Sequence, residues 1–158
     1  MKSVLISIQP KWCELIASGK KTVEVRKTKP KLDVPFKCYI YCTKDKPTFT
    51  QSAFCDDVSN GRVIGEFVCD YITSLKADNM IQAYYNNTKE TCLTDEEIKR
   101  YANNGKLYYW HISDLVIYDK PRELSEFVYA STVHTNCFGK HTKRVTRPPQ
   151  SWCYVEEL

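Results

Sequence analysis

The residues QPKWCELIASGKKTVEVR, Gln9–Arg26, place a short amphipathic helix directly before a strand. Pro10 suits the first turn of a helix, because the N–H that proline lacks would have no intrahelical partner there. Apolar side chains then recur three and four residues apart, and Gly19 fits the left-handed position that ends a helix. The period changes to two immediately afterwards, which predicts a strand over residues 21–26.

This predicted strand has two different faces. Val23 and Val25 point to one side. Thr22, Glu24 and Arg26 point to the other. A polar face of this kind is usually solvated, and an ion pair on it stabilises by only about 0–1 kcal/mol. The alternative is a binding site, since arginine offers a planar fork to a phosphate or a base edge, and glutamate accepts from an exocyclic amine.

Four residues of the stretch have the spacing G-x-K-x-x-E-x-R, namely Gly19, Lys21, Glu24 and Arg26. This pattern after a short helix resembles the signature of ASCH domains, a family of the PUA-like superfamily. Gln9, Pro10 and Trp12 also resemble the start of the family's helix. The resemblance implies that the strand lines a ligand cleft, with Lys21 at its mouth.

Length and composition indicate one folded domain over residues 1–158. The chain has 158 residues, of which 42% are hydrophobic and 13% aromatic, enough for a sizeable core. Its formal charge of +4 is compatible with an anionic partner. The apolar run at the N-terminus is too short for a secretory signal, and no segment approaches the ~20 apolar residues of a membrane helix. We therefore expect a cytoplasmic protein with no membrane partner.

The remaining chain predicts an α+β fold. Further strands are expected over residues 3–8, 36–43, 62–75, 107–118 and 151–155, with helices over 10–18, 78–86 and 94–102 and a helical turn over 124–127. Polar loops are expected over 44–60 and 130–147. Gly65 predicts a bend or bulge, and Thr94 begins a capping box. No βαβ unit repeats, so a doubly wound sheet is disfavoured. The pattern, together with the family resemblance, predicts a small mixed PUA-like β-barrel of about six strands with peripheral helices.

The cysteines and histidines predict no metal site and no cofactor. Eight cysteines are present, and none forms the C-x-x-C spacing of a zinc site. In a cytoplasmic chain they are expected to be free thiols. His134, Cys137 and His141 form a pattern unlike the common ligand sets. The sequence also lacks a P-loop and a G-x-G-x-x-G motif.

Each of the three tryptophans could be a core residue or could stack on a base. Core packing is the commoner role of large aromatics, whereas stacking contributes about 1–3 kcal/mol per base. Trp12 is the preferred stacking candidate because it adjoins the motif, and Trp110 and Trp152 are the others. The resemblance implies that the last strand starts near the cleft, which makes Gln150 and Ser151 candidates for reading base or sugar edges.

The basic residues form two sets along the chain, one within residues 20–31 and one within residues 140–147. A run of charge is usually a solvated face. If both sets converge at the cleft, they form the electrostatic footprint of a phosphate backbone.

The leading hypothesis is a nucleic-acid- or nucleotide-binding domain that recognises RNA, a single strand or a modified nucleoside in a basic cleft. Its predicted ligand-binding residues are Trp12, Lys21, Thr22, Glu24, Arg26, Gln150, Ser151 and Trp152. The alternative is a small hydrolase in which Lys21 and Glu24 would be catalytic. Some ASCH-like proteins are acetylcytidine amidohydrolases, and others have been proposed as ribonucleases. The amidohydrolases keep the lysine but carry a threonine where this chain has Glu24. A protein-interaction module is the third hypothesis.

Overall fold

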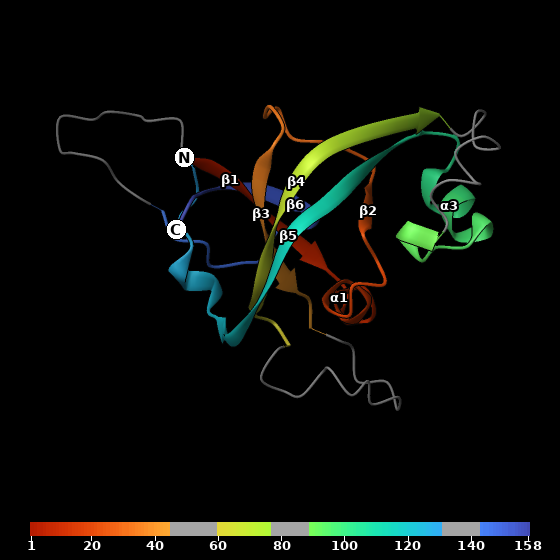
Figure 1. Cartoon of the computed structure of the whole chain (residues 1–158). Helices are drawn as coiled ribbons and strands as arrows, with labels where there is room; N and C mark the ends of the chain where they lie inside the picture. The colour runs from red at the N-terminus through yellow and green to blue at the C-terminus, as the bar shows by residue number, and fades with distance from the viewer. Residues whose placement is uncertain (45–59, 77–88, 131–142) are drawn as a thin grey trace. The chain divides into compact units, whose positions relative to one another are not determined.

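The structure is a computed structural model that describes residues 1–44, 60–76, 89–130 and 143–158 (Figure 1). The strands and short helices of these residues follow in the order β1 (Lys2–Ile8), α1 (Pro10–Ala17), β2 (Val23–Arg26), β3 (Phe36–Cys42), β4 (Val63–Lys76), α3 (Asp95–Ala102), β5 (Lys106–Arg122), the 3-10 helix η2 (Leu124–Glu126) and β6 (Trp152–Glu156). None of the helices among the described residues is long and apolar enough to cross a membrane.

The strands form a mixed sheet in the order β2-β5-β4-β3-β1-β6. β1 is parallel to β3 and antiparallel to β6, and β2 is antiparallel to β5. The predicted α+β class is confirmed, but the predicted closed barrel is wrong. In the described residues the end strands β2 and β6 do not pair with each other. β2 has only four residues and is followed by a segment containing Pro30 and Pro35, whose missing N–H groups cannot extend a ladder.

The chain divides into two compact units, each with its own residues from β4 and β5. Unit 1 comprises Met1–Cys13, Lys37–Phe67 and Val116–Leu158, and unit 2 comprises Glu14–Phe36 and Val68–Leu115. The description of each unit rests on its described residues. A single domain over residues 1–158 stays a prediction.

One hydrophobic cluster of unit 1 lies on one face of β1, β3 and β6, and the opposite face of β1 and β3 is buried as well. The fully buried members of this cluster include Leu5, Tyr39, Phe127 and Val155. Gly65 lets β4 approach β5 closely, because a Cβ built there would lie 2.4 Å from the carbonyl oxygen of Val116. Gly65 was predicted to mark a bend or bulge. In the structure its missing side chain permits a close contact between two backbones.

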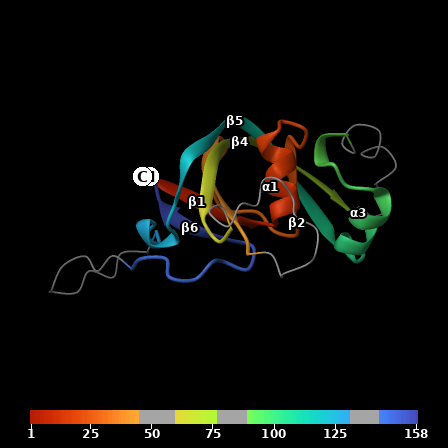
Figure 2. The ribbon, with the colours of Figure 1, turned by 90° about the horizontal axis from the view of Figure 1, so that it is seen from below.

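The core of unit 2 joins β2 and β5 to α3. Val23 and Val25 of β2 pack with Ile98 and Ala102 of α3, and two views show this helix beside the strand (Figures 1 and 2). The predicted capping box at Thr94 is confirmed: its hydroxyl accepts from the backbone N–H of residue 97, whose carboxylate accepts from the Thr94 N–H at 2.8 Å. The helix thus starts where its sequence specifies.

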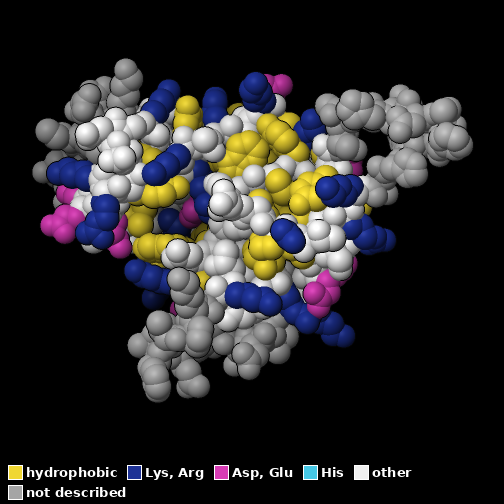
Figure 3. Space-filling model, turned by 180° about the vertical axis from the view of Figure 1, so that it is seen from behind, with side chains coloured by type: hydrophobic (Ala, Val, Ile, Leu, Met, Phe, Trp, Pro, Cys, Tyr) yellow, Lys and Arg dark blue, Asp and Glu magenta, His cyan; other side chains and the backbone are white. Residues whose placement is uncertain are grey.

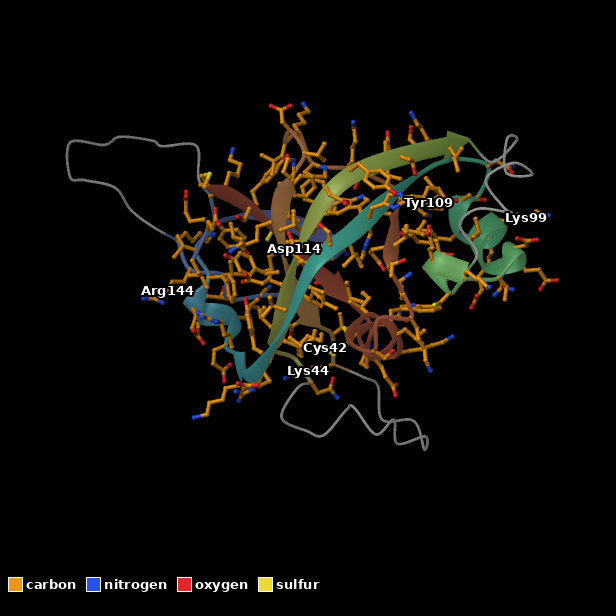
Figure 4. The ribbon with its side chains drawn as sticks, in the orientation of Figure 1. Cys42, Lys44, Lys99, Tyr109, Asp114 and Arg144 are labelled. Atoms are coloured by element: carbon orange, nitrogen blue, oxygen red, sulfur yellow. The ribbon has the colours of Figure 1, made fainter. Side chains whose placement is uncertain are left out.

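β5 differs most from its prediction. The strand was predicted over residues 107–118, yet it continues through Pro121 to Arg122. Proline has no N–H to donate to a neighbouring strand. β2 pairs only with residues 108–111 of β5, so Pro121 removes no hydrogen bond to β2. Asp114, labelled in Figure 4, has a φ of 45°, a left-handed conformation within the strand. The helix predicted over 78–86 and most of both predicted loops lie outside the described residues.

Candidate functional site

The turn from α1 into β2 sets up the motif. Gly19 has a φ of 72°, the left-handed conformation expected of it at the helix end. The backbone N–H of Lys21 then donates to the carbonyl of Leu15 at 2.9 Å, which directs the chain straight into β2. All four residues of β2 are buried.

Glu24 contacts two cations, and we call Lys21, Glu24 and Arg26 the charge cluster. Arg26 Nη2 lies 3.1 Å from Glu24 Oε1, and Lys21 Nζ lies 3.4 Å from Glu24 Oε2. The three residues are only 2%, 6% and 9% exposed, in the order Lys21, Glu24 and Arg26. The interpretation of this strand face as solvated is therefore wrong, because the side chains lie inside unit 2.

Burial changes the energetics of the charge cluster. Removing an ion from water costs several kcal/mol, and mutual attraction offsets that cost only when the geometry is good. Apolar side chains of similar volume would often stabilise a fold as well or better. The three side chains also carry a formal charge of +1 together. Stability is therefore a weak reason for the sequence to keep them.

A second segment, residues 90–92, runs beside the motif. Lys21 Nζ donates to the carbonyl of Thr91 at 2.6 Å, and the backbone N–H of Thr22 donates to the carbonyl of Glu90 at 2.9 Å. Thr22 itself is exposed and precedes β2, so it lies apart from the buried face. Sequence reasoning missed Thr91, because a backbone carbonyl leaves no signature in a sequence.

Aromatic side chains of β5 accompany the charge cluster. The antiparallel register places Glu24 opposite Trp110 and Arg26 opposite Tyr108, and directly opposed residues share a face of the sheet. Trp110 is fully buried and meets Phe36 edge to face at 5.8 Å, so it is a core residue. The charge cluster thus shares its face of the sheet with aromatic residues, and an apolar neighbourhood strengthens electrostatic interactions.

The opposite face of this part of β5 serves the core. Tyr109, labelled in Figure 4, pairs with Val25 and packs in the core of unit 2. His111 pairs with Val23 and stacks on the ring of Tyr71 at 3.7 Å. The alternation along β5 thus separates the face of the charge cluster from the face that carries Tyr109 and His111.

The other predicted ligand-binding residues belong to unit 1. Trp12 is half-buried, with the Lys11 ammonium 4.4 Å from the centre of its ring. Gln150 is exposed, Ser151 is half-buried, and Trp152 begins β6. The structure therefore brings Lys21, Glu24 and Arg26 together in unit 2. The predicted residues at the start of β6, Gln150, Ser151 and Trp152, belong to unit 1.

Basic side chains are spread over the face shown in Figure 3, where acidic side chains are few. Such a surface favours the approach of an anionic molecule.

A separate polar network lies in unit 1. Glu66 receives a hydrogen bond from the Tyr118 hydroxyl at 2.5 Å, and its other oxygen lies 3.1 Å from Lys37 Nζ. Lys37 of β3 is therefore the basic partner of this carboxylate. Burial alone would raise the pKa of Glu66, but these two contacts outweigh it and hold the pKa below its ordinary value of 4.5.

The lowered pKa of Glu66 predicts acid-dependent stability. A carboxylate whose pKa is lower in the folded chain stabilises fully above its unfolded value and loses this contribution as pH falls through the folded value. Urea unfolding of the wild type and Glu66→Gln should therefore show a larger difference in the free energy of unfolding at pH 7 than at pH 3. Equal differences at both pH values would contradict this assignment.

The described cysteines are free thiols at positions 13, 38, 42, 69, 92 and 153. No group of three or more His, Cys, Asp or Glu residues in the described segments could hold a metal ion. His134, Cys137 and His141 lie outside those segments, so the absence of metal and cofactor stays a prediction.

Comparison with known proteins agrees with the motif. The family model of the ASCH domain matches residues 6–111. The crystal structure of ASCH from Zymomonas mobilis is similar, with a TM-score of 0.59 and 19% identity over 98% of this chain and 88% of that one. A mutant ZmASCH protein from the same organism has a TM-score of 0.60 and 18% identity, covering 99% of this chain and 92% of the other. No curated protein matches the chain.

Proposed function

Because this chain belongs to the ASCH domain family, which has a PUA-like fold, we propose that it binds RNA or a modified nucleoside through the charge cluster of β2. The observation that carries the proposal is the burial of Lys21, Glu24 and Arg26, at most 9% exposed, with a combined formal charge of +1. A phosphate or another anionic group of the ligand would offset this excess charge.

The chemistry of the charge cluster suits such a ligand. A guanidinium presents several donors in a fixed plane and can hold a phosphate or a base edge with two hydrogen bonds. The Glu24 carboxylate already lies 3.1 Å from Arg26 Nη2, which restrains the guanidinium before any ligand arrives. Restraint of this kind lowers the entropy lost on binding.

Arg26→Met is expected to weaken the binding of a short single-stranded RNA about 10-fold or more, because a hydrogen bond to a charged group contributes about 1.5–3 kcal/mol. Fluorescence anisotropy with labelled RNA would measure the affinity, and competition with cytidine and acetylated cytidine would measure nucleoside binding. Affinity should also fall steeply with salt, because phosphate contacts release counterions.

Arg62→Met is the matched control for this experiment. Arg62 pairs with Glu123 at 2.8 Å, and its side chain is 38% exposed, so its removal deletes the same charge at a surface position of unit 1. Equal affinities of the Arg26 and Arg62 variants would contradict a role of the charge cluster in binding.

Binding ranks above hydrolysis for a geometric reason. A lysine acts as a general base only after its ammonium has lost a proton. Lys21 Nζ instead donates to the carbonyl of Thr91 at 2.6 Å and lies 3.4 Å from the Glu24 carboxylate, so two acceptors already hold it. Turnover of acetylated cytidine or RNA by the wild type, abolished in Lys21→Met while binding is retained, would make the hydrolase hypothesis preferable to the binding hypothesis.

A further inference from the structure

Tyr71 of β4 and His111 of β5 form a stacked pair of rings within unit 2. The two strands are neighbours in the sheet, and the ring centres lie 3.7 Å apart with an angle of 17° between the ring planes. His111 is half-buried, whereas Tyr71 is 48% exposed. The imidazole therefore covers one face of the Tyr71 ring, and nearly half of the tyrosine remains open to solvent.

Two exposed acidic residues, Asp70 and Glu90, accompany this pair of rings. Asp70 precedes Tyr71, and its Oδ1 accepts from the Tyr71 N–H at 3.0 Å. Glu90 belongs to the other side of the pair: two backbone hydrogen bonds of 2.9 Å join it through Thr22 to Ile112 of β5. Each ring thus has a carboxylate-bearing residue beside its own strand.

The charges of these carboxylates reach both rings. Burial raises the pKa of Tyr71, and the negative charges of Asp70 and Glu90 raise it further. Burial lowers the pKa of His111 below its ordinary value of 6.5, although the same two carboxylates oppose this change. At pH 7 the site is therefore a stack of two uncharged rings in a negative field.

A surface of this kind suits a cation and repels a phosphate. The face of an aromatic ring attracts positive charge. A guanidinium is planar and weakly hydrated, so it stacks on such a face more readily than an ammonium. Asp70 forms no ion pair with any residue that the structure describes. Its carboxylate is therefore available to a positive group from another molecule.

Tyr101 shows what Tyr71 lacks. It is the other exposed tyrosine among the described residues, at 37%, and Lys27 Nζ lies 5.0 Å from the centre of its ring. Within the described segments, no lysine or arginine occupies the corresponding place over Tyr71. A cation from a partner would complete at Tyr71 the pairing that this chain itself completes at Tyr101.

We propose that Tyr71, His111, Asp70 and Glu90 form a docking site for an arginine side chain of a partner protein, and we call these four residues the arginine site. The guanidinium stacks on the exposed part of Tyr71 and pairs with the Asp70 carboxylate. The arginine site lies wholly within unit 2 and shares no residue with the charge cluster. It therefore does not depend on the binding of RNA.

NMR titration with arginine blocked at both ends, N-acetyl-arginine methylamide, tests the arginine site. The ligand should shift the ring signals of Tyr71 and His111. Blocked citrulline has the same shape without the charge and should shift them much less. Tyr71→Leu and Asp70→Asn are each expected to weaken the binding about 2- to 5-fold, because each removes one contact of an exposed site.

Two matched variants control for general effects of removing a ring or a charge. Tyr101→Leu removes the tyrosine that already has its own cation, and Asp119→Asn removes an exposed carboxylate of unit 1. Both should bind blocked arginine like the wild type. Tyr71→Phe keeps the ring and should also bind like the wild type. Urea unfolding shows whether each variant is folded, and the comparison with citrulline needs no variant.

Three results would overturn the inference. Equal shifts with blocked arginine and blocked citrulline would show that charge is not recognised. Equal weakening by Tyr71→Leu and Tyr101→Leu would show that the ring of Tyr71 has no special role. Adenosine that shifts the same ring signals at lower concentrations than blocked arginine would identify a platform for a base instead. Failure of the wild type to bind RNA would contradict the proposed function and leave the arginine site standing.

Discussion

Glu24→Ala is expected to lower the free energy of unfolding by about 3–5 kcal/mol, the cost of leaving a buried charge without its partner. The carboxylate lies within 3.4 Å of both Lys21 and Arg26, and all three side chains are buried. Its removal leaves two cations close together in an apolar environment. Urea unfolding followed by circular dichroism measures the change.

Glu24→Gln separates charge from shape in this experiment. Glutamine keeps the length of the side chain and can still accept a hydrogen bond, but it carries no negative charge. We expect an intermediate loss of stability. A loss below about 1 kcal/mol for Glu24→Ala would match an exposed ion pair and contradict the buried charge cluster.

Trp110→Ala is expected to destabilise by about 3–5 kcal/mol, because it removes a large buried ring and leaves a cavity. Trp110 is fully buried and packs edge to face with Phe36 at 5.8 Å. The same unfolding measurement applies. Trp12→Ala is the control. The Trp12 ring is half-buried, so its removal should lower the free energy of unfolding by less. Equal losses at both positions would show that Trp110 does not have the core role assigned to it.

Local chemistry made several elements predictable from sequence. α1 begins at Pro10 and its terminal turn contains Gly19 with a positive φ, and α3 follows the capping box at Thr94. Each of these signals acts within four residues, so the sequence alone contains it. The alternating residues of β1, β3 and β6 likewise placed these strands to within one or two residues of their observed ends.

Features that depend on distant parts of the chain could not be predicted in the same way. The polar residues of β2 have the spacing of a solvated strand face, and only the pairing with β5 and the packing around Trp110 bury them. The contact between Lys21 and the Thr91 carbonyl joins residues 70 positions apart. Whether the sheet closes depends on whether the end strands β2 and β6 pair with each other. Their alternation of apolar and polar residues is the same in both cases, so the sequence does not reveal the outcome.

We expect the charge cluster to serve binding more than stability. The most direct test of this expectation is the RNA affinity of the triple variant Lys21→Met/Glu24→Leu/Arg26→Met, with urea unfolding as the check that it is folded. Replacing buried ions with apolar residues of similar volume is often neutral or stabilising. We expect the triple variant to fold, with an unfolding free energy within about 2 kcal/mol of the wild type, and to bind RNA at least 10-fold more weakly. A folded triple variant that binds RNA as tightly as the wild type would contradict it.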